Sequence, residues 1–309
     1  MKIVITGAAG LVGQNLIARL KTRPHVEIVG IDKHPENTRL LRRMHPQVQV
    51  VEADLAHDSY WQRFLDGADA VVINQAQIGG LNEQAFLDNN VLATQRIVAA
   101  MRAYRVPYFV QVSSSVVNSA ADDFYTRSKT AQEKLVNQVT DIPHVVLRPT
   151  LMFGWFDRKH LGWLRRFMAR TPVFPVPGDG CYIRQPLYVG DFAEIIIASL
   201  MRRQTGTFDI SGQEQIFYGD LIRLIKRTVK ARTLLVNIPY RLFWLLLALY
   251  ARINANPPFT TSQLKALVIP ETFPTIDWPG IFGVDATPLE EAVRETYLDA
   301  EYGNIVLEF

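Results

Sequence analysis

The sequence predicts an α/β protein with a doubly wound parallel sheet, because short apolar runs alternate with amphipathic segments through the first 150 residues. The apolar runs, such as residues 70–73, are hydrophobic at almost every position, which is typical of parallel strands covered on both faces. We expect strands at residues 2–6, 27–31, 48–51, 70–74, 108–113 and 145–148. Helices are expected between them, at residues 11–22, 58–66, 83–104 and 125–140.

The pattern loosens after Pro149, where prolines and glycines become frequent. We therefore divide the chain into a core at residues 1–150 and a smaller C-terminal lobe at residues 151–309, with segments that return to complete the sheet. Helices in this half are expected at residues 191–202, 218–230, 239–253 and 288–298. A proline cluster that includes Pro257 and Pro258 precedes the last of them.

Composition excludes several classes of protein. The 309 residues carry a net charge of +3 with mixed signs, so nothing indicates a nucleic-acid partner. The single cysteine, Cys181, excludes an internal disulfide and fits a reducing compartment. The chain begins without the pattern of a signal peptide, and we expect a cytoplasmic protein. No metal is expected, because the six histidines lack ligand spacing: His25, His34, His45, His57, His144 and His160.

A glycine-rich turn at residues 6–13 follows the first expected strand directly and opens the first expected helix. In this context Gly7 permits a tight turn, Gly10 lets the backbone approach a pyrophosphate, and Gly13 lets the helix pack closely on the strand. The helix N-terminus would then bind the phosphates. The turn predicts a Rossmann dinucleotide site, and its remaining contacts are expected from Ala9, Leu11 and Val12.

Asp32 ends the second expected strand, about 20 residues after the turn, where a carboxylate can accept hydrogen bonds from the adenosine ribose. It would repel a 2′-phosphate, so NAD is preferred over NADP, although Lys33 and Arg39 lie nearby. The alternative is that Asp32 caps a turn. Further cofactor contacts are expected after the third and fourth strands, at Asp54, Leu55, Gln75, Ala76 and Gln77. For Asp54, an N-cap of the next helix is the alternative.

Tyr125 and Lys129 are four residues apart on an expected helix and therefore share one face. An ammonium close to a phenol favours the phenolate and lowers the pKa of the tyrosine. A tyrosine tuned in this way can take a hydroxyl proton while a hydride leaves the adjacent carbon. The pair gains weight because it follows three consecutive serines, residues 113–115, at the end of the fifth expected strand.

Together these motifs resemble the extended or atypical short-chain dehydrogenase/reductase superfamily, which contains the NAD-dependent epimerases and dehydratases. The resemblance covers about residues 1–215, with its motifs in the expected order: 6–13, Asp32, 54–55, 90–91, 112–115, 125–129, 147–149 and 184–191.

This resemblance implies that Tyr125 is the general acid/base and that Lys129 tunes it and holds the nicotinamide ribose. Ser115 would bind the reacting oxygen, with Ser114 as the second choice. Arg184 would hold a substrate phosphate, with a structural ion pair as the alternative. Asn90 would order the active-site backbone, and the other residues implied around the cofactor are Val112, Ser113, Pro149, Thr150 and Met152.

The implied activity is that of an NAD-dependent oxidoreductase or epimerase with a small-molecule substrate, either a sugar nucleotide or another secondary alcohol or ketone. Only nine residues separate Ser115 from Tyr125, which is a short loop for a sugar-nucleotide enzyme. A dehydrogenase for a hydrophobic alcohol, sterol-like or isoprenoid-like, is one alternative. The second is a non-catalytic dinucleotide-binding subunit, because residues 282–284 and 287–291 are similar to the branch of the respiratory complex I accessory subunit.

The segment 238–253 is apolar nearly all round. Three interpretations remain open: packing inside the lobe, a subunit contact or hydrophobic pocket, and peripheral contact with a membrane. Basic residues near it would suit anionic lipid, or simply form solvated faces: Arg202, Arg203, Lys226, Arg227, Lys230 and Arg232. By analogy with the family we also expect a homodimer.

Overall fold

The computed structural model describes residues 1–158, 161–253 and 260–308. Seven strands form one parallel sheet in the order β3-β2-β1-β4-β5-β6-β11. Their bounds are β1 (Lys2–Thr6), β2 (Glu27–Asp32), β3 (Gln49–Glu52), β4 (Ala70–Ile73), β5 (Phe109–Val112), β6 (His144–Pro149) and β11 (Gly206–Ile210). This arrangement confirms the predicted doubly wound sheet.

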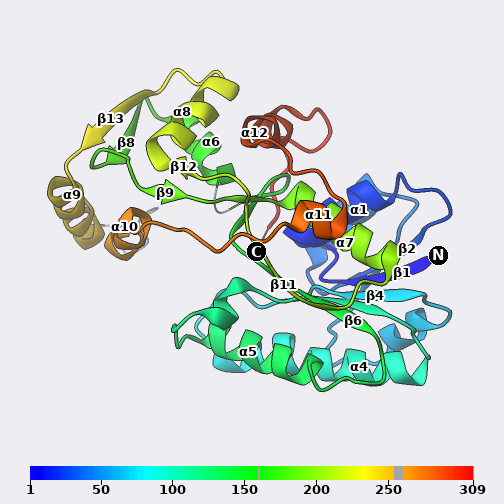
Figure 1. Cartoon of the computed structure of the whole chain (residues 1–309). Helices are drawn as coiled ribbons and strands as arrows, with labels where there is room; N and C mark the ends of the chain where they lie inside the picture. The colour runs from blue at the N-terminus through cyan, green and yellow to red at the C-terminus, as the bar shows by residue number, and fades with distance from the viewer. Residues whose placement is uncertain (159–160, 254–259, 309) are drawn as a thin grey trace.

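Helices cover both faces of the sheet (Figure 1). One layer contains α4 (Ala93–Ala103) and α5 (Phe124–Val136), and the other contains α1 (Leu11–Leu20), α7 (Val189–Arg202) and α11 (Trp278–Phe282). Successive side chains of a strand point to opposite faces, so Ile3 and Ile5 pack in the layer of α1 and α7, whereas Val4 packs in the layer of α4. All three side chains are fully buried.

The strand order reverses between β1 and β4. From β1 the chain moves outward to β2 and β3, then crosses to β4 and continues through β5 and β6 in the other direction. Loops therefore diverge at the carboxyl ends of β1 and β4, and such a switch point is where doubly wound sheets bind ligands.

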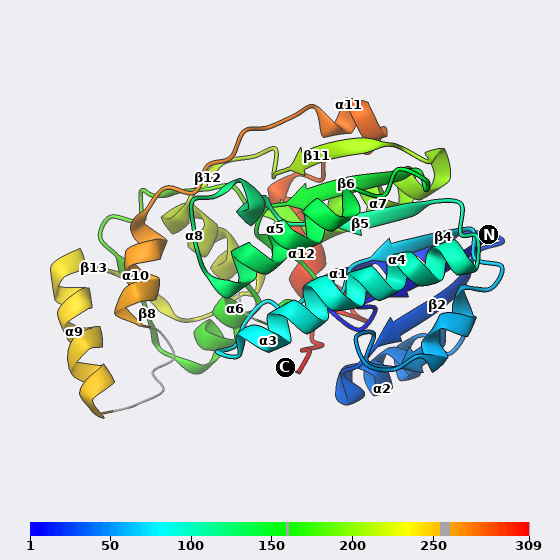
Figure 2. The same ribbon diagram turned by 90° about the horizontal axis from the view of Figure 1, so that it is seen from below.

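The second half of the chain forms a lobe beside this edge of the sheet, while β11, α7 and α11 return to the core (Figure 2). The boundary at residue 150 stays a prediction. The lobe's own core contains Phe153, Ile222 and Ile225. Its elements are β7 (Met152–Phe153), α6 (Leu161–Arg170), β8 (Val173–Pro177), β9 (Ile183–Arg184), β10 (Leu187–Tyr188), β12 (Ile216–Phe217), α8 (Tyr218–Thr228), β13 (Leu234–Ile238), α9 (Tyr240–Ile253), α10 (Thr261–Val268) and α12 (Leu289–Leu298).

Three helical segments of the first 150 residues differ from the sequence-based expectation, and three helices of the second half, α6, α10 and α11, were not expected. Residues 58–66 form a short 3-10 helix, η1 (Tyr60–Leu65), and not an α-helix. The helix α2 (Pro35–Met44) was not expected, because it buries only Asn37, Thr38 and Leu41 and so has little apolar periodicity. Residues 83–104 divide into α3 (Glu83–Phe86), a π-helical turn η2 (Leu87–Leu92) and α4. Pro257, Pro258 and His160 lie outside the described residues.

Candidate active site

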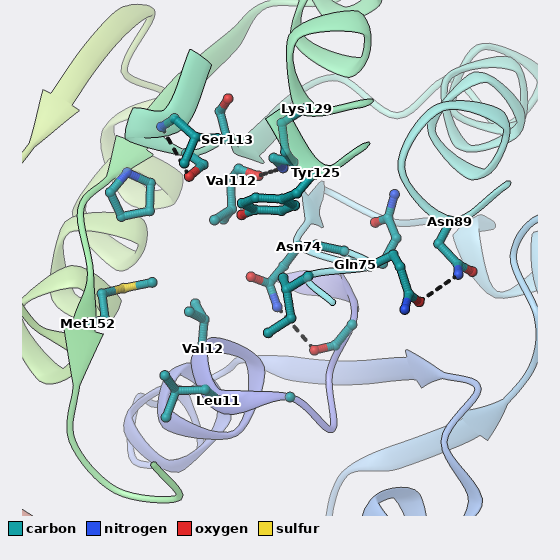
Figure 3. A pocket seen from close by; sticks show the side chains of 18 of the residues that line it. Leu11, Val12, Asn74, Gln75, Asn89, Val112, Ser113, Tyr125, Lys129 and Met152 are labelled. Carbon is teal, nitrogen blue, oxygen red and sulfur yellow. Dashed lines mark hydrogen bonds between the residues drawn. The ribbon is translucent and has the colours of Figure 1, made fainter. Parts of the chain in front are cut away.

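A cavity of about 950 Å³ lies at the switch point, between the glycine turn and the ends of β4, β5 and β6 (Figure 3). Four residues of the lobe, Leu151, Met152, Glu271 and Phe273, complete its wall. The structure brings most of the predicted site residues into this wall: Gly7, Ala9, Gly10, Leu11, Val12, Asp32, Lys33, Leu55, Gln75, Ala76, Gln77, Val112, Ser113, Ser114, Ser115, Tyr125, Lys129, Pro149, Thr150 and Met152. Four predicted residues, Gly13, Asp54, Asn90 and Arg184, do not line it.

Close backbone approach explains the glycine turn. Gly7 has a φ of +61°, and a Cβ there would lie 2.7 Å from the Cα of Gln75 at the end of β4. A Cβ on Gly13 would lie 2.5 Å from the carbonyl oxygen of Gly7, so Gly13 acts in packing and not in the cavity wall. Gly10 is the N-cap of α1, and no side chain caps that helix. The positive end of α1 therefore faces the cavity, as an anion requires.

Asp32 links the turn to the end of β2. Its Oδ2 accepts a hydrogen bond from the Ala9 amide at 2.9 Å, and its Oδ1 accepts one from the His34 amide at 3.0 Å. Burial raises the pKa of the Asp32 carboxyl, although these backbone hydrogen bonds oppose the shift. Asp32 therefore has the turn-capping contacts of the alternative interpretation and also lies on the cavity wall.

Asp54 lies outside the wall and has the geometry of a cap. Its Oδ1 accepts a hydrogen bond from the Ala56 amide at 2.9 Å, and its Oδ2 lies 3.4 Å from the Lys33 Nζ. Lys33 also donates to the Asn89 Oδ1 at 2.6 Å. This hydrogen bond connects η2 to the segment that follows β2. Asn89 is a wall residue that sequence reasoning missed.

Asn90, also on η2, is fully buried behind the cavity. Its Oδ1 accepts a hydrogen bond from the Gln77 amide at 2.7 Å, and its Nδ2 donates to the Ser128 Oγ at 2.8 Å. The side chain thereby connects the backbone after β4 to the helix that carries Tyr125. A π-helical turn is uncommon and is often found at functional sites, because it displaces side chains from regular helical positions.

The amine of Lys129 lies fully buried between α5 and β5. Its Nζ donates to the carbonyl oxygen of Val112 at 2.9 Å and to the Gln132 Oε1 at 2.5 Å. Burial lowers the pKa of Lys129 to about 7, and the charge of Glu133 opposes this shift. The amine is therefore close to the midpoint of its titration at neutral pH.

Tyr125 projects into the cavity beside Lys129 (Figure 3). Burial raises the pKa of the Tyr125 hydroxyl, and a side-chain hydrogen bond with Ser114 opposes that shift. The Lys129 amine bonds to Val112 and Gln132, and the lowering of the Tyr125 pKa by Lys129 stays a prediction. The hydrogen bond is formed with Ser114, whereas Ser115 begins the 3-10 helix η3 (Ser115–Asn118). The role of either serine with a substrate stays a prediction.

Ser113 points away from Tyr125 into a charged network. Its Oγ donates to the Glu133 Oε2 at 2.5 Å, and the Arg148 guanidinium forms an ion pair with the same carboxylate. The Arg148 contact and the Ser113 hydrogen bond lower the pKa of Glu133 against the effect of burial. Glu133 is therefore a stable negative charge close to the buried amine of Lys129.

Arg184 has the contacts of a structural ion pair. Its guanidinium bonds to the carbonyl oxygens of Leu267 and Ile269 and lies 3.3 Å from the Glu271 Oε2, with 11% of the side chain exposed. Its role with substrate phosphate stays a prediction. The wall residues that sequence reasoning missed are His34, Pro35, Asn37, Ala53, Ile78, Asn89, Ala93, Val116, Ser119, Glu271 and Phe273. Most neighbour a strand end, but no sequence signal marks Glu271 or Phe273.

The residues of this cavity fit a dinucleotide. The helix N-terminus at Gly10 suits a pyrophosphate, and the Asp32 carboxylate suits ribose hydroxyls. At the other end, the Thr150 Oγ1 is buried without a hydrogen-bond partner among the described residues, so it is available to a bound group. Fold and site together define a Rossmann protein of the short-chain dehydrogenase type.

The chain belongs to the NAD dependent epimerase/dehydratase family, whose profile matches residues 3–211. Membership confirms NAD as the expected cofactor, since dependence on NAD is part of the family's description. Among the described residues, no group of histidine, cysteine, aspartate and glutamate has a metal-binding arrangement.

Two curated relatives carry the names of different activities. An uncharacterized UDP-glucose epimerase of Bacillus subtilis is 27% identical over 73% of this chain and 81% of its own length. A 2-alkyl-3-oxoalkanoate reductase of Stenotrophomonas maltophilia is 25% identical over 95% of this chain and 98% of its own. The solved structure of a UDP-glucose 4-epimerase from Thermotoga maritima matches 96% of this chain and 97% of that chain, with 16% identity and a TM-score of 0.73.

Replacement of Gly10 by alanine should affect NAD binding, whereas replacement of Gly13 by alanine should affect stability. Gly13→Ala should lower the free energy of unfolding by about 1–3 kcal/mol, because its Cβ would overlap backbone atoms of Gly7 and Ala8. Gly10→Ala should fold normally, since its nearest neighbour is 3.4 Å from the added carbon, but should bind NAD at least about tenfold more weakly. Urea unfolding and calorimetric titration measure the two effects. NAD binding of Gly10→Ala at the parent affinity would place the pyrophosphate elsewhere.

The lowered pKa of Lys129 predicts that the free energy of unfolding depends on pH. Between its folded pKa of about 7 and its ordinary value of 10.5 the unfolded chain binds more protons at this residue, so its contribution to stability rises with pH. From pH 7 to pH 10 the free energy of unfolding of the parent should rise by roughly 3 to 4 kcal/mol relative to Lys129→Met. Urea unfolding of both proteins at the two pH values measures this difference, and parallel curves would show that the amine is not buried as described.

Proposed function

We propose that the protein is an NAD-dependent oxidoreductase or epimerase that transfers a hydride at a secondary alcohol or ketone, with Tyr125 as general acid/base. One observation carries the proposal: Tyr125, Ser114 and Lys129 lie on the wall of the same cavity as the glycine turn. A protein that only holds a dinucleotide does not need a half-buried phenol and a buried amine on that wall.

Bound NAD supplies the hydride acceptor, or in its reduced form the hydride donor. The Tyr125 phenolate takes the proton of the substrate hydroxyl as the hydride leaves, and the resulting Tyr125 hydroxyl returns that proton in the reverse direction. Ser114, which already bonds to Tyr125, holds the reacting oxygen in line with that hydroxyl. Both side chains come from rigid elements, the N-terminus of α5 and the end of β5, so their separation is fixed by packing.

Lys129 assists Tyr125 when its amine is charged. A positive charge beside a phenol stabilises the phenolate, and the effect is large where water is excluded. The pKa of Lys129 near 7 means that a small gain in hydrogen bonding is enough to protonate the amine. Ribose hydroxyls of the cofactor, as acceptors, are suited to provide that gain. The preference for NAD over NADP rests on the Asp32 carboxylate, which disfavours a 2′-phosphate.

A second candidate is a substrate with an apolar substituent in place of a sugar nucleotide. The wall after β6 is lined by Leu151, Met152 and Phe273, while the guanidinium of Arg184 is occupied by main-chain carbonyls and Glu271. A diphosphate would thus meet a carboxylate at this end of the cavity. The name of the Stenotrophomonas relative, a reductase of alkyl-substituted oxoalkanoates, is consistent with such a substrate.

Tyr125→Phe tests the assignment of the acid/base. The variant should lose at least about 100-fold in turnover, which is the usual contribution of general acid/base catalysis, and should bind NAD with unchanged affinity. Steady-state kinetics with an alkyl-substituted 3-oxo acid and with UDP-glucose, together with calorimetry, measure both quantities. Tyr104→Phe, on the C-terminal end of α4 outside the cavity wall, is the matched control. Full activity of Tyr125→Phe would require another acid/base.

A further inference from the structure

The α9 surface, defined as α9 with the neighbouring strand β13 and helix α10, forms the end of the lobe (Figure 1). In both ribbon views it lies farthest from the sheet and beside no other part of the core (Figure 2). Neither the cofactor site nor the proposed reaction uses it.

Large apolar side chains cover α9 on several sides. Five of them are each 45–48% exposed, which is unusual for leucine and tryptophan: Leu242, Trp244, Leu245, Leu246 and Leu249. On β13, Leu234 is 63% exposed and Val236 is 42% exposed. A contiguous apolar patch of this kind marks a surface that is covered by a partner.

The charged side chains of the segment that carries this patch have one sign. From Leu221 to Pro270 the sequence contains eight lysines and arginines and no aspartate or glutamate, whereas the rest of the chain is net negative. Arg241, Arg252 and Lys265 are exposed, and among the described residues they form no ion pair. Arg223 and Arg227 do form ion pairs, with Asp220 and Glu290 outside the segment.

We propose that the α9 surface docks on a lipid bilayer that contains anionic lipids. Apolar and aromatic side chains flanked by unpaired basic residues are the composition of a helix that lies in the membrane interface. A second copy of the chain fits less well, because it would bring two strongly positive segments together.

The length of α9 agrees with docking parallel to the membrane. Its 14 residues extend about 21 Å, less than the roughly 30 Å of a bilayer core. No helix in the described part of the chain combines the length and apolarity needed to span a membrane. The helix would bury its leucines and Trp244 at the boundary between headgroups and acyl chains, and leave the lobe and core in water.

Vesicle flotation tests the proposal with the full chain. The protein should float with vesicles that contain about 30 mol % phosphatidylglycerol in phosphatidylcholine, and should float far less with phosphatidylcholine alone or in high salt. The absence of flotation with anionic vesicles at low salt would overturn the proposal. Size-exclusion chromatography is the second readout, because a dimer that Leu245→Ser dissociates would assign the surface to a second copy instead.

Matched variants distinguish vesicle binding through the α9 surface from nonspecific adsorption of the protein. Leu245→Ser should weaken vesicle partitioning roughly tenfold, whereas Leu298→Ser, which removes a 56% exposed leucine of α12, should not change it. Arg241→Gln should weaken it about fivefold, and Arg43→Gln on α2 should not. All four should retain NAD binding, since none lines the cavity. Equal partitioning of Leu245→Ser and the parent would contradict the proposal.

Discussion

The burial of one amine, that of Lys129, is the constraint on which the proposed chemistry depends. Lys129 has almost no exposed surface, and among the described residues its amine donates to two acceptors, the Val112 carbonyl and the Gln132 amide oxygen. A lysine in such a place is costly unless its charge is compensated, and burial accordingly lowers its pKa to about 7. The amine can therefore gain a proton whenever a new acceptor reaches it, which is the property that a tuner of Tyr125 needs.

The position of that amine follows from the sheet. Val112 ends β5 and Lys129 lies on α5, the helix that leads from β5 to β6, so the parallel order places the amine at the carboxyl edge. The same edge carries the glycine turn after β1, where Gly7 contacts the backbone after β4. Asn90 holds the intervening segment to α5. The glycine turn and the cluster of Tyr125 and Lys129 are thus two parts of one switch point.

The sequence predicted those features that depend on residues close together in the chain. The central strands are continuous apolar runs, so the sheet was predictable. Gly7 and Gly13 stand where an added Cβ would overlap backbone atoms, so the glycine turn at one end of the cavity was predictable as well. Contacts between residues far apart in the sequence were not predictable. Asp54 bonds locally and lies outside the wall, Arg184 is occupied by residues 83–87 positions away, and Phe273 reaches the cavity only because the lobe folds back. The polar helix α2 lacked the apolar periodicity on which the prediction of helices depends.

The central claim is that the dinucleotide lies across the strand ends with its nicotinamide at Tyr125. A crystal structure of the protein with NAD tests it most directly. The account predicts that the pyrophosphate lies at the N-terminus of α1, that the nicotinamide ring lies beside the Tyr125 hydroxyl, and that the Lys129 Nζ bonds to the nicotinamide ribose. A nicotinamide held away from Tyr125, with Lys129 still bonded to Val112 and Gln132 alone, would contradict it.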